Sequence, residues 1–295
     1  MAQAIVSQAV SKPKKRKIAE PSFEFAISVV LVCAMVATFI PIFYVFLISL
    51  SPKAGDISPS GWNFEAYKTL IANSRFYRAL LNSILITLGG VTISVIMTVM
   101  TAYPLSRANL PGRQFFMVVM LAAFLFGAGL IPGFMLVKGV GLYGTWWSLW
   151  LPVAISVYNT FVMKAFFQGI PPSLIDAAEI DGASEWQILT LVVLPLSTPI
   201  LLTVGMFYGV GYWNDFFAPI LYLNKDDQMP LPVLLRDIIT GASGADFTDS
   251  SFFSRTHLEA LKMAAVFLTM LPMLIVYPWI QRHFTKGVLL GSVKE

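Results

Sequence analysis

Four carboxylates lie within ten residues of one stretch, Pro171–Pro195, in an otherwise apolar chain. They belong to Asp176, Glu179, Asp181 and Glu185, and such side chains can form ion pairs with basic groups of a partner. The chain shows no metal-ligand spacing and no Gly-x-Ser-x-Gly nucleophile elbow, so we expect neither a catalytic residue nor a metal site. The sequence therefore favours a docking role for this stretch over a chemical one.

The acidic stretch is predicted to form two short helices that meet at a turn. Ser173 with Asp176, and Ser184 with Gln187, have the spacing of a capping box, which begins a helix. Gly182 is suited to the left-handed conformation that closes the first helix and redirects the chain.

One face of the first helix is predicted to be nearly flat, which would let a partner approach closely. At 100° per residue it carries Leu174, Ala177, Ala178 and Asp181. The alternative is an amphipathic helix lying at the lipid interface. Such helices are usually rich in Lys and Arg, whereas this one is acidic and would be repelled by anionic lipid.

The composition is that of a polytopic membrane protein, predicted to be all-α. Of 295 residues, 57% are hydrophobic and 12% are charged, with a mean hydropathy of +0.73, whereas about 25% of residues are charged in an ordinary soluble domain. Apolar runs long enough to cross a bilayer predict about six spans. They cover Phe25–Leu50, Ala79–Tyr103, Phe115–Val137, a fourth run ending at Phe167, Leu196–Leu223 and Ala260–Ile280.

Basic residues predict the topology. A cluster of Lys and Arg at residues 12–17 precedes the first span, which favours a cytoplasmic N-terminus. Six spans then place both termini, and the acidic stretch at 171–195, in the cytoplasm. The predicted organisation is an N-terminal tail (1–24), one transmembrane domain (25–282) and a C-terminal tail (283–295).

The sequence shows no phosphate loop and no proton relay through which the chain itself would use energy. It has no Gly-x-x-x-x-Gly-Lys-Ser/Thr loop for binding ATP, so we expect no bound cofactor. Asp215 is the one acid clearly inside a predicted span, which is too few for a proton relay, although one acid could still bind a cation. An ion-coupled secondary carrier would show paired intramembrane charges or inverted halves, and neither is visible. Energy is expected to enter through another subunit.

The acidic stretch resembles the EAA signature of ATP-binding-cassette (ABC) importer permeases. The family pattern is Glu-Ala-Ala, two residues, Asp-Gly-Ala, about eight residues and Ile-x-Leu-Pro. The matching residues here are Asp176-Ala177-Ala178, Asp181-Gly182-Ala183 and Val192-Val193-Leu194-Pro195. Asp176 replaces the usual Glu and Val192 the usual Ile, and the spacing is kept throughout.

Further segments along nearly the whole chain resemble MalG-type carbohydrate permeases and their LplC-type branch. Members of that branch are associated with complex oligosaccharides and polysaccharides, including uronate-containing ones of the alginate and pectin type. The segments are Asn82-Ser83, Tyr103–Arg107, Trp213–Asp215, Pro230–Ile239, Tyr277–Gln281, Lys286-Gly287 and Gly291–Lys294.

The resemblance implies a type I (MetI-like) permease in a bacterial inner membrane. Its partners would be a second permease chain, two ATPase subunits that hold ATP and Mg, and an extracytoplasmic solute-binding protein. The EAA segment would be the coupling helix that docks on an ATPase subunit. Its implied residues are Asp176, Ala177, Ala178, Glu179, Asp181, Gly182, Ala183, Leu194 and Pro195. The EAA signature alone would also permit a non-sugar solute.

Polar and aromatic residues in the spans are candidates for the sugar path. They are Tyr158, Asn159, Tyr212, Trp213, Asn214 and Asp215. The alternative for each is a polar contact between helices, which is also the role expected for Asn82. The outer loop Asn224–Glu259 is a candidate docking surface for the binding protein.

Overall fold

The computed structural model describes residues 21–51, 62–240 and 258–291, and every regular element within these ranges is a helix. Residues 1–20 of the predicted tail (1–24) lie outside the described residues. The predicted boundary at residue 24 falls inside a helix, because α1 already begins at Pro21. At the other end α14 continues to Gly291, so no break in the helix marks the predicted boundary at 282.

Three helices are long and apolar enough to span a membrane on their own. They are α1 (Pro21–Ser49), α3 (Ser74–Ser106) and α14 (Leu258–Gly291). Each lies on one of the predicted spans.

The other three predicted spans are bent rather than straight. α4 (Arg113–Leu125) and α5 (Leu130–Gly139) meet at 116°, and the segments Trp147–Val153 and Val157–Gln168 (α7) meet at 54°. Glu185–Leu196 and α11 (Thr198–Asn214) meet at 81°. The predicted bounds of this fifth span, Leu196–Leu223, are therefore wrong, because the bent pair begins inside the acidic stretch and α11 ends before Asp215. Counting each bent pair as one span gives six among the described residues, in agreement with the predicted number.

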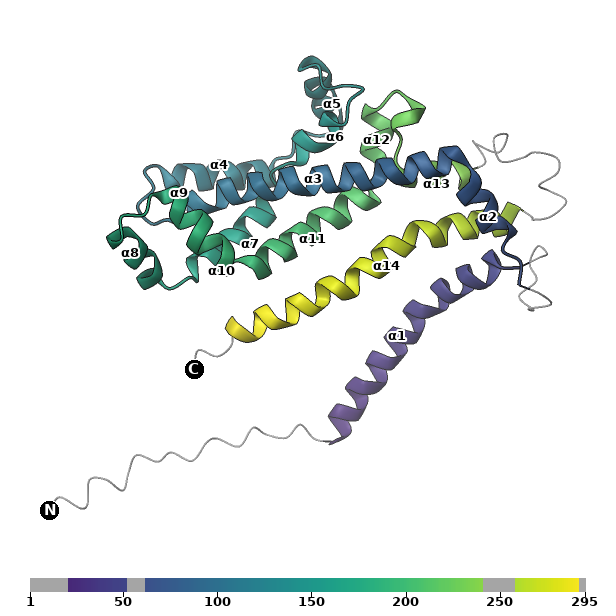
Figure 1. Ribbon diagram of the computed structural model, residues 1–295, viewed down its shortest axis with the longest axis horizontal. Coiled ribbons are helices and arrows are strands. Elements are labelled where there is room, and N and C mark those ends of the chain that lie inside the picture. The colour runs from purple at the N-terminus through teal and green to yellow at the C-terminus, as the bar shows by residue number, and fades with distance from the viewer. Residues whose placement is uncertain (1–20, 52–61, 241–257, 292–295) are drawn as a thin grey trace.

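Short elements make up the first halves of two bent spans. Trp147–Val153 consists of α6 (Trp147–Trp150) and η2 (Leu151–Val153), and Glu185–Leu196 consists of α9 (Glu185–Gln187), η3 (Ile188–Val193) and α10 (Leu194–Leu196). The other short helices are α2 (Glu65–Ala72), α8 (Pro172–Ile180), α12 (Phe217–Tyr222), η4 (Asp226–Gln228) and α13 (Leu231–Thr240). Figure 1 shows α8 and α9 at one end of the bundle and α2 and α13 at the opposite end.

Helix α3 is the centre of the bundle and packs along both α11 and α7. α1 stands apart over most of its length, where its side chains are exposed, and joins α14 at its C-terminal end. There the rings of Phe46 and Phe267 lie 5.1 Å apart between centroids. The long exposed part of α1 has the apolar surface that a helix presents to lipid or to another membrane helix.

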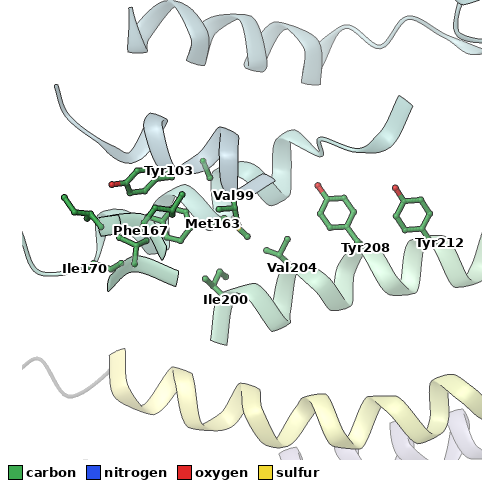
Figure 2. Close-up of a cluster of buried hydrophobic side chains, with 13 residues drawn as sticks. Val99, Tyr103, Met163, Phe167, Ile170, Ile200, Val204, Tyr208 and Tyr212 are labelled. Carbon is green, nitrogen blue, oxygen red and sulfur yellow. The ribbon is translucent and has the colours of Figure 1, made fainter. Parts of the chain in front are cut away.

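Two main hydrophobic clusters hold the bundle. One, at the α2 and α13 end, includes the fully buried Leu70, Leu231 and Leu261. The other joins α3, α7 and α11 to η3 around Met163 and Val204, both fully buried (Figure 2). This second cluster extends to the end of the bundle that carries the acidic stretch.

Candidate functional site

The acidic stretch forms two short helices joined by a turn, as predicted, but the first helix begins differently. Pro172 occupies its first turn, and the preceding Pro171 provides no side-chain cap. The predicted capping box at Ser173 is therefore wrong, because Ser173 already lies inside the helix. Proline suits this place, since its missing N–H would have no partner within the helix and its fixed φ is already helical.

The end of α8 is a Schellman motif. Gly182 has φ +81°, and its N–H donates to the Glu179 carbonyl at 3.0 Å. The N–H of Ala183 donates to the Ala178 carbonyl, also at 3.0 Å. These two bonds satisfy carbonyls that the helix end would leave unpaired, and they require a left-handed residue at position 182. The predicted role of Gly182 in the turn is confirmed.

Helix α9 begins with the predicted capping box. The Ser184 hydroxyl accepts from the Gln187 N–H at 3.4 Å, and the Ser184 N–H donates to the Gln187 side chain at 2.8 Å. The chain then continues into η3, a π-helical turn whose Ile188 and Val193 are buried in the second cluster. The following Leu194 is half-buried and Pro195 is exposed.

An arginine at the end of α3 fastens this helix pair to the bundle. Arg107 forms ion pairs with Glu179 of α8 and with Glu185 of α9, the latter at 3.2 Å. The Tyr103 hydroxyl donates to the other oxygen of Glu185 at 2.6 Å. Partial burial acts to lower the pKa of Arg107, but the bond to Glu179 and the charge of Glu185 outweigh it and hold that pKa above its ordinary value.

This four-residue clamp of Tyr103, Arg107, Glu179 and Glu185 was not predicted. Glu179 was expected to meet a partner protein, yet its carboxylate is engaged within the chain. The segment Tyr103–Arg107 belongs to the family resemblance, but nothing in it identifies a contact 72 residues away.

The rest of α8 divides into an inner and an outer face. Ala178 and Ala183 are half-buried and pack against the second cluster. Asp176, Ala177 and Asp181 are exposed, and among the described residues neither aspartate has a hydrogen-bond or ion-pair partner. The exposed face of the helix therefore differs from the predicted one. Ala178 faces the bundle, and Ile180, which is 86% exposed, lies on the outside instead.

Two of the sugar-path candidates are part of the helix packing. The Tyr212 hydroxyl bonds to the Ser94 hydroxyl at 2.9 Å, and its ring lies against Gly90 of α3. The indole N–H of Trp213 donates to the Thr269 carbonyl of α14 at 3.2 Å. Both are polar contacts between helices, which is the alternative to a role in the sugar path.

The other four candidates do not come together into one site. Asn159 is buried in α7, whereas the neighbouring Tyr158 is exposed beside Phe207. The Asn214 side chain is exposed and donates to a carbonyl of its own helix at 2.9 Å. The Asp215 carboxylate accepts the first backbone N–H groups of α12. A path role for these residues stays a prediction.

At the opposite end of the bundle, a polar pair on α3 holds the start of the outer loop. The Asn82 amide donates to the backbone carbonyls of Asp227 and Met229 at 2.7 and 3.1 Å. The Ser83 hydroxyl accepts from the Leu231 N–H at 2.7 Å. The expected contact of Asn82 with another spanning helix is thus corrected to a contact with a short turn. Residues 241–257 of the predicted docking loop lie outside the described residues.

Nearby side chains form a small polar pocket of about 270 Å³ at this end, with Arg78 and Asp237 in its wall. Within the described ranges, no three His, Cys, Asp or Glu side chains lie close enough together to hold a metal ion.

Known proteins resemble this chain along most of its length. The family described as "binding-protein-dependent transport system inner membrane component" matches residues 69–290. The chain is 41% identical over 238 residues to the polygalacturonan/rhamnogalacturonan transport system permease protein YtcP of Bacillus subtilis strain 168, covering 80% of this chain and 83% of that protein. It is 37% identical over 250 residues to protein LplC of the same organism, covering 83% of each.

One solved structure has the same fold over nearly its full length. It is the crystal structure of a bacterial ABC transporter involved in the import of the acidic polysaccharide alginate. The match has a TM-score of 0.82 at 27% identity and covers 91% of this chain and 99% of the other.

Proposed function

The chain belongs to the family of binding-protein-dependent transport system inner membrane components, and from that premise we propose that it is the permease subunit of an ATP-driven importer of acidic oligo- or polysaccharides. Its permease fold, helical throughout the described ranges and with bent spans, supports a transport role. The sugar class is supported by the relatives, whose names refer to polygalacturonan, rhamnogalacturonan and alginate. These polymers share uronate units, so the proposed substrate carries carboxylates.

The outer face of α8 is the proposed contact with an ATPase subunit. The observation that carries this proposal is a helix with two opposite faces. Asp176, Ala177 and Asp181 are exposed at the tip of the bundle, while the back of the same helix is fastened to α3 through Arg107. A force applied to the exposed face is thereby transmitted to the central helix. ATP and Mg would be held by the ATPase subunits.

The remaining partners follow from this arrangement. The α8 end would face the cytoplasm of a bacterium, with both termini on that side of the inner membrane. A second permease chain would complete the translocation path. A solute-binding protein would dock at the opposite end, where Asn82 and Ser83 position the outer loop.

The proposal is tested on the assembled importer with Gly182→Val. A valine at φ +81° is strained, by about 1–2 kcal/mol for a left-handed conformation, so the turn between α8 and α9 should shift. Insertion into the membrane should persist, while uptake per ATP hydrolysed falls. Gly127→Val is the matched control, because that glycine has open space around it and no positive φ.

Unchanged coupling in Gly182→Val would contradict the role of α8. The choice of substrate is tested separately, by the ATPase activity of the complex with binding proteins loaded with uronate oligosaccharides, neutral sugars or amino acids. Stimulation by an amino acid alone would instead favour the alternative of a non-sugar importer. Transport by the purified chain without any ATPase would contradict the whole assignment.

A further inference from the structure

An open groove of about 760 Å³ lies between α4 and α7 at the α8 end of the bundle. Its apolar wall is formed by Met117, Leu121 and Phe161, and its rim by Arg113 and Gln114. This volume is in the range of pockets that hold small molecules, about 300–1,000 Å³. None of the residues assigned to coupling or to the sugar path lies in it.

One cation stands at the rim of this groove, and a second lies on the neighbouring helix. Arg113 is held by its Nε, which donates to the Leu105 carbonyl at 2.9 Å. Lys164 lies on the same face of α7 as Phe161, three residues away. Arg113 begins α4, Lys164 lies in the second half of α7, and these two helices are in contact.

Neither cation is neutralised. Among the described residues, no carboxylate forms an ion pair with Arg113 or Lys164, and the polar partner of Lys164 is Gln168 at 3.2 Å. Arg107 differs, since two carboxylates face it. The first turn of α4 contains no acidic residue either, so the positive end of its helix dipole adds to the same field.

The groove combines a charged rim with an apolar wall. Arg113 begins α4, and the side chains that follow, such as Phe115, Phe116 and Val118, are exposed and apolar. Two positive charges above an apolar wall therefore match a negative headgroup attached to a hydrocarbon chain. Basic pockets between transmembrane helices on the cytoplasmic side bind anionic lipids in this way.

We propose that the groove binds an anionic phospholipid. Its phosphate lies between Arg113 and Lys164, and an acyl chain follows Met117 and Phe161. A zwitterionic lipid fits less well, because its own ammonium group repels the two cations. A helix of a second permease would need to bring an acid to this rim to compensate both charges.

The test measures lipid retention by the full-length protein, purified in detergent with its copurifying subunits. Dioleoyl phosphatidylglycerol and dioleoyl phosphatidylcholine are titrated separately, and bound lipids are counted by native mass spectrometry. The two probes share their acyl chains and differ in headgroup charge. The variants are Arg113→Gln/Lys164→Gln and, as a control, Lys138→Gln, which removes an exposed cation from the end of α5.

We expect one phosphatidylglycerol to be held more tightly than phosphatidylcholine by the unmodified protein and by Lys138→Gln. The double variant should bind it about 25-fold more weakly, since each cation near an anionic lipid contributes about fivefold. Equal retention by the double variant would overturn the proposal, as would equal affinity for the two lipids. Displacement of the lipid by millimolar inorganic phosphate would also overturn it, because the site would then recognise the anion alone.

If the double variant fails to fold, each single variant is measured, with an expected loss of about fivefold. A disulfide or cross-link from a cysteine placed at Met117 to a second permease, in membranes, would show that protein covers the groove. That result would overturn the lipid assignment. Cross-linking to lipid at the same position would support it.

Discussion

Replacing Arg107 by glutamine should loosen α8 and α9 from the bundle while leaving the transmembrane helices folded. The change removes the positive charge that joins Glu179 and Glu185 to the end of α3. Glu185 would keep its bond from the Tyr103 hydroxyl at 2.6 Å. The helix pair α8 and α9 would thus remain near its place but would separate from the end of α3 more often.

The size of the effect follows from the exposure of the groups. The side chains of Glu179 and Glu185 are 50% and 65% exposed, and that of Arg107 is 25% exposed. Exposed ion pairs contribute about 0.2–1 kcal/mol each, and the partial burial of Arg107 puts these two at the upper end. Losing both should lower the free energy of local opening by about 1–2 kcal/mol, which is a factor of about 5–30 in the open population.

Hydrogen exchange of the backbone amides measures this opening directly. Peptides covering residues 180–190 should exchange about 5–30-fold faster in Arg107→Gln, with no change in α11. Arg78→Gln is the matched control, because Arg78 is an exposed arginine near the other end of the same helix. In the assembled importer, the same variant should import less substrate per ATP hydrolysed. Unchanged exchange at 180–190 would refute the clamp, and equal acceleration throughout the protein would show that the whole fold had been destabilised instead.

Two further predictions concern the packing around α3. Gly90→Ala would place a Cβ 2.6 Å from the Tyr212 ring and should destabilise the protein by about 1–3 kcal/mol in thermal unfolding. The control is Gly209→Ala, whose added Cβ would have its nearest contact at 3.6 Å and should cost far less stability. Equal losses of stability in the two variants would contradict the close packing at Gly90. Asn82→Ala removes two hydrogen bonds, each contributing about 0.5–1.5 kcal/mol. Limited proteolysis should therefore cut residues 227–231 faster in the variant than in the unmodified protein. Equal cutting rates in the two proteins would contradict the role of Asn82 in holding this turn.

Local features of the acidic stretch could be predicted because their partners are near in sequence. The capping box of Ser184 and Gln187 spans three residues, and the left-handed Gly182 follows from the rules of helix ends. The prediction of a capping box at Ser173 was wrong, and the cause is also near in sequence. Pro171 and Pro172 stand directly before it, and a proline in the first turn displaces the cap that a serine would provide.

Features that join distant segments could not be predicted. Apolar length indicates that a segment can cross a membrane, but it carries no information on direction, so the bend of 116° between α4 and α5 was missed. The partners of Arg107 and Asn82 lie 72 or more residues away, and many polar groups compete for such pairings. The inward turn of Ala178 also depends on this tertiary contact, because the clamp fixes which side of α8 meets the bundle.

The π-helical turn η3 places one extra residue between the acidic helix pair and the rest of the bundle. A π turn contains one residue more than an α turn closed by the same backbone. Deleting one residue from Ile188–Val193 would therefore let the turn return to α-helix while the residues before it keep nearly the same rotational position. The same deletion in a regular α-helical turn would rotate everything before it by about 100° about the helix axis, and Glu185 would then point away from Tyr103 and Arg107. The π turn is therefore the place where this segment should best tolerate the loss of one residue.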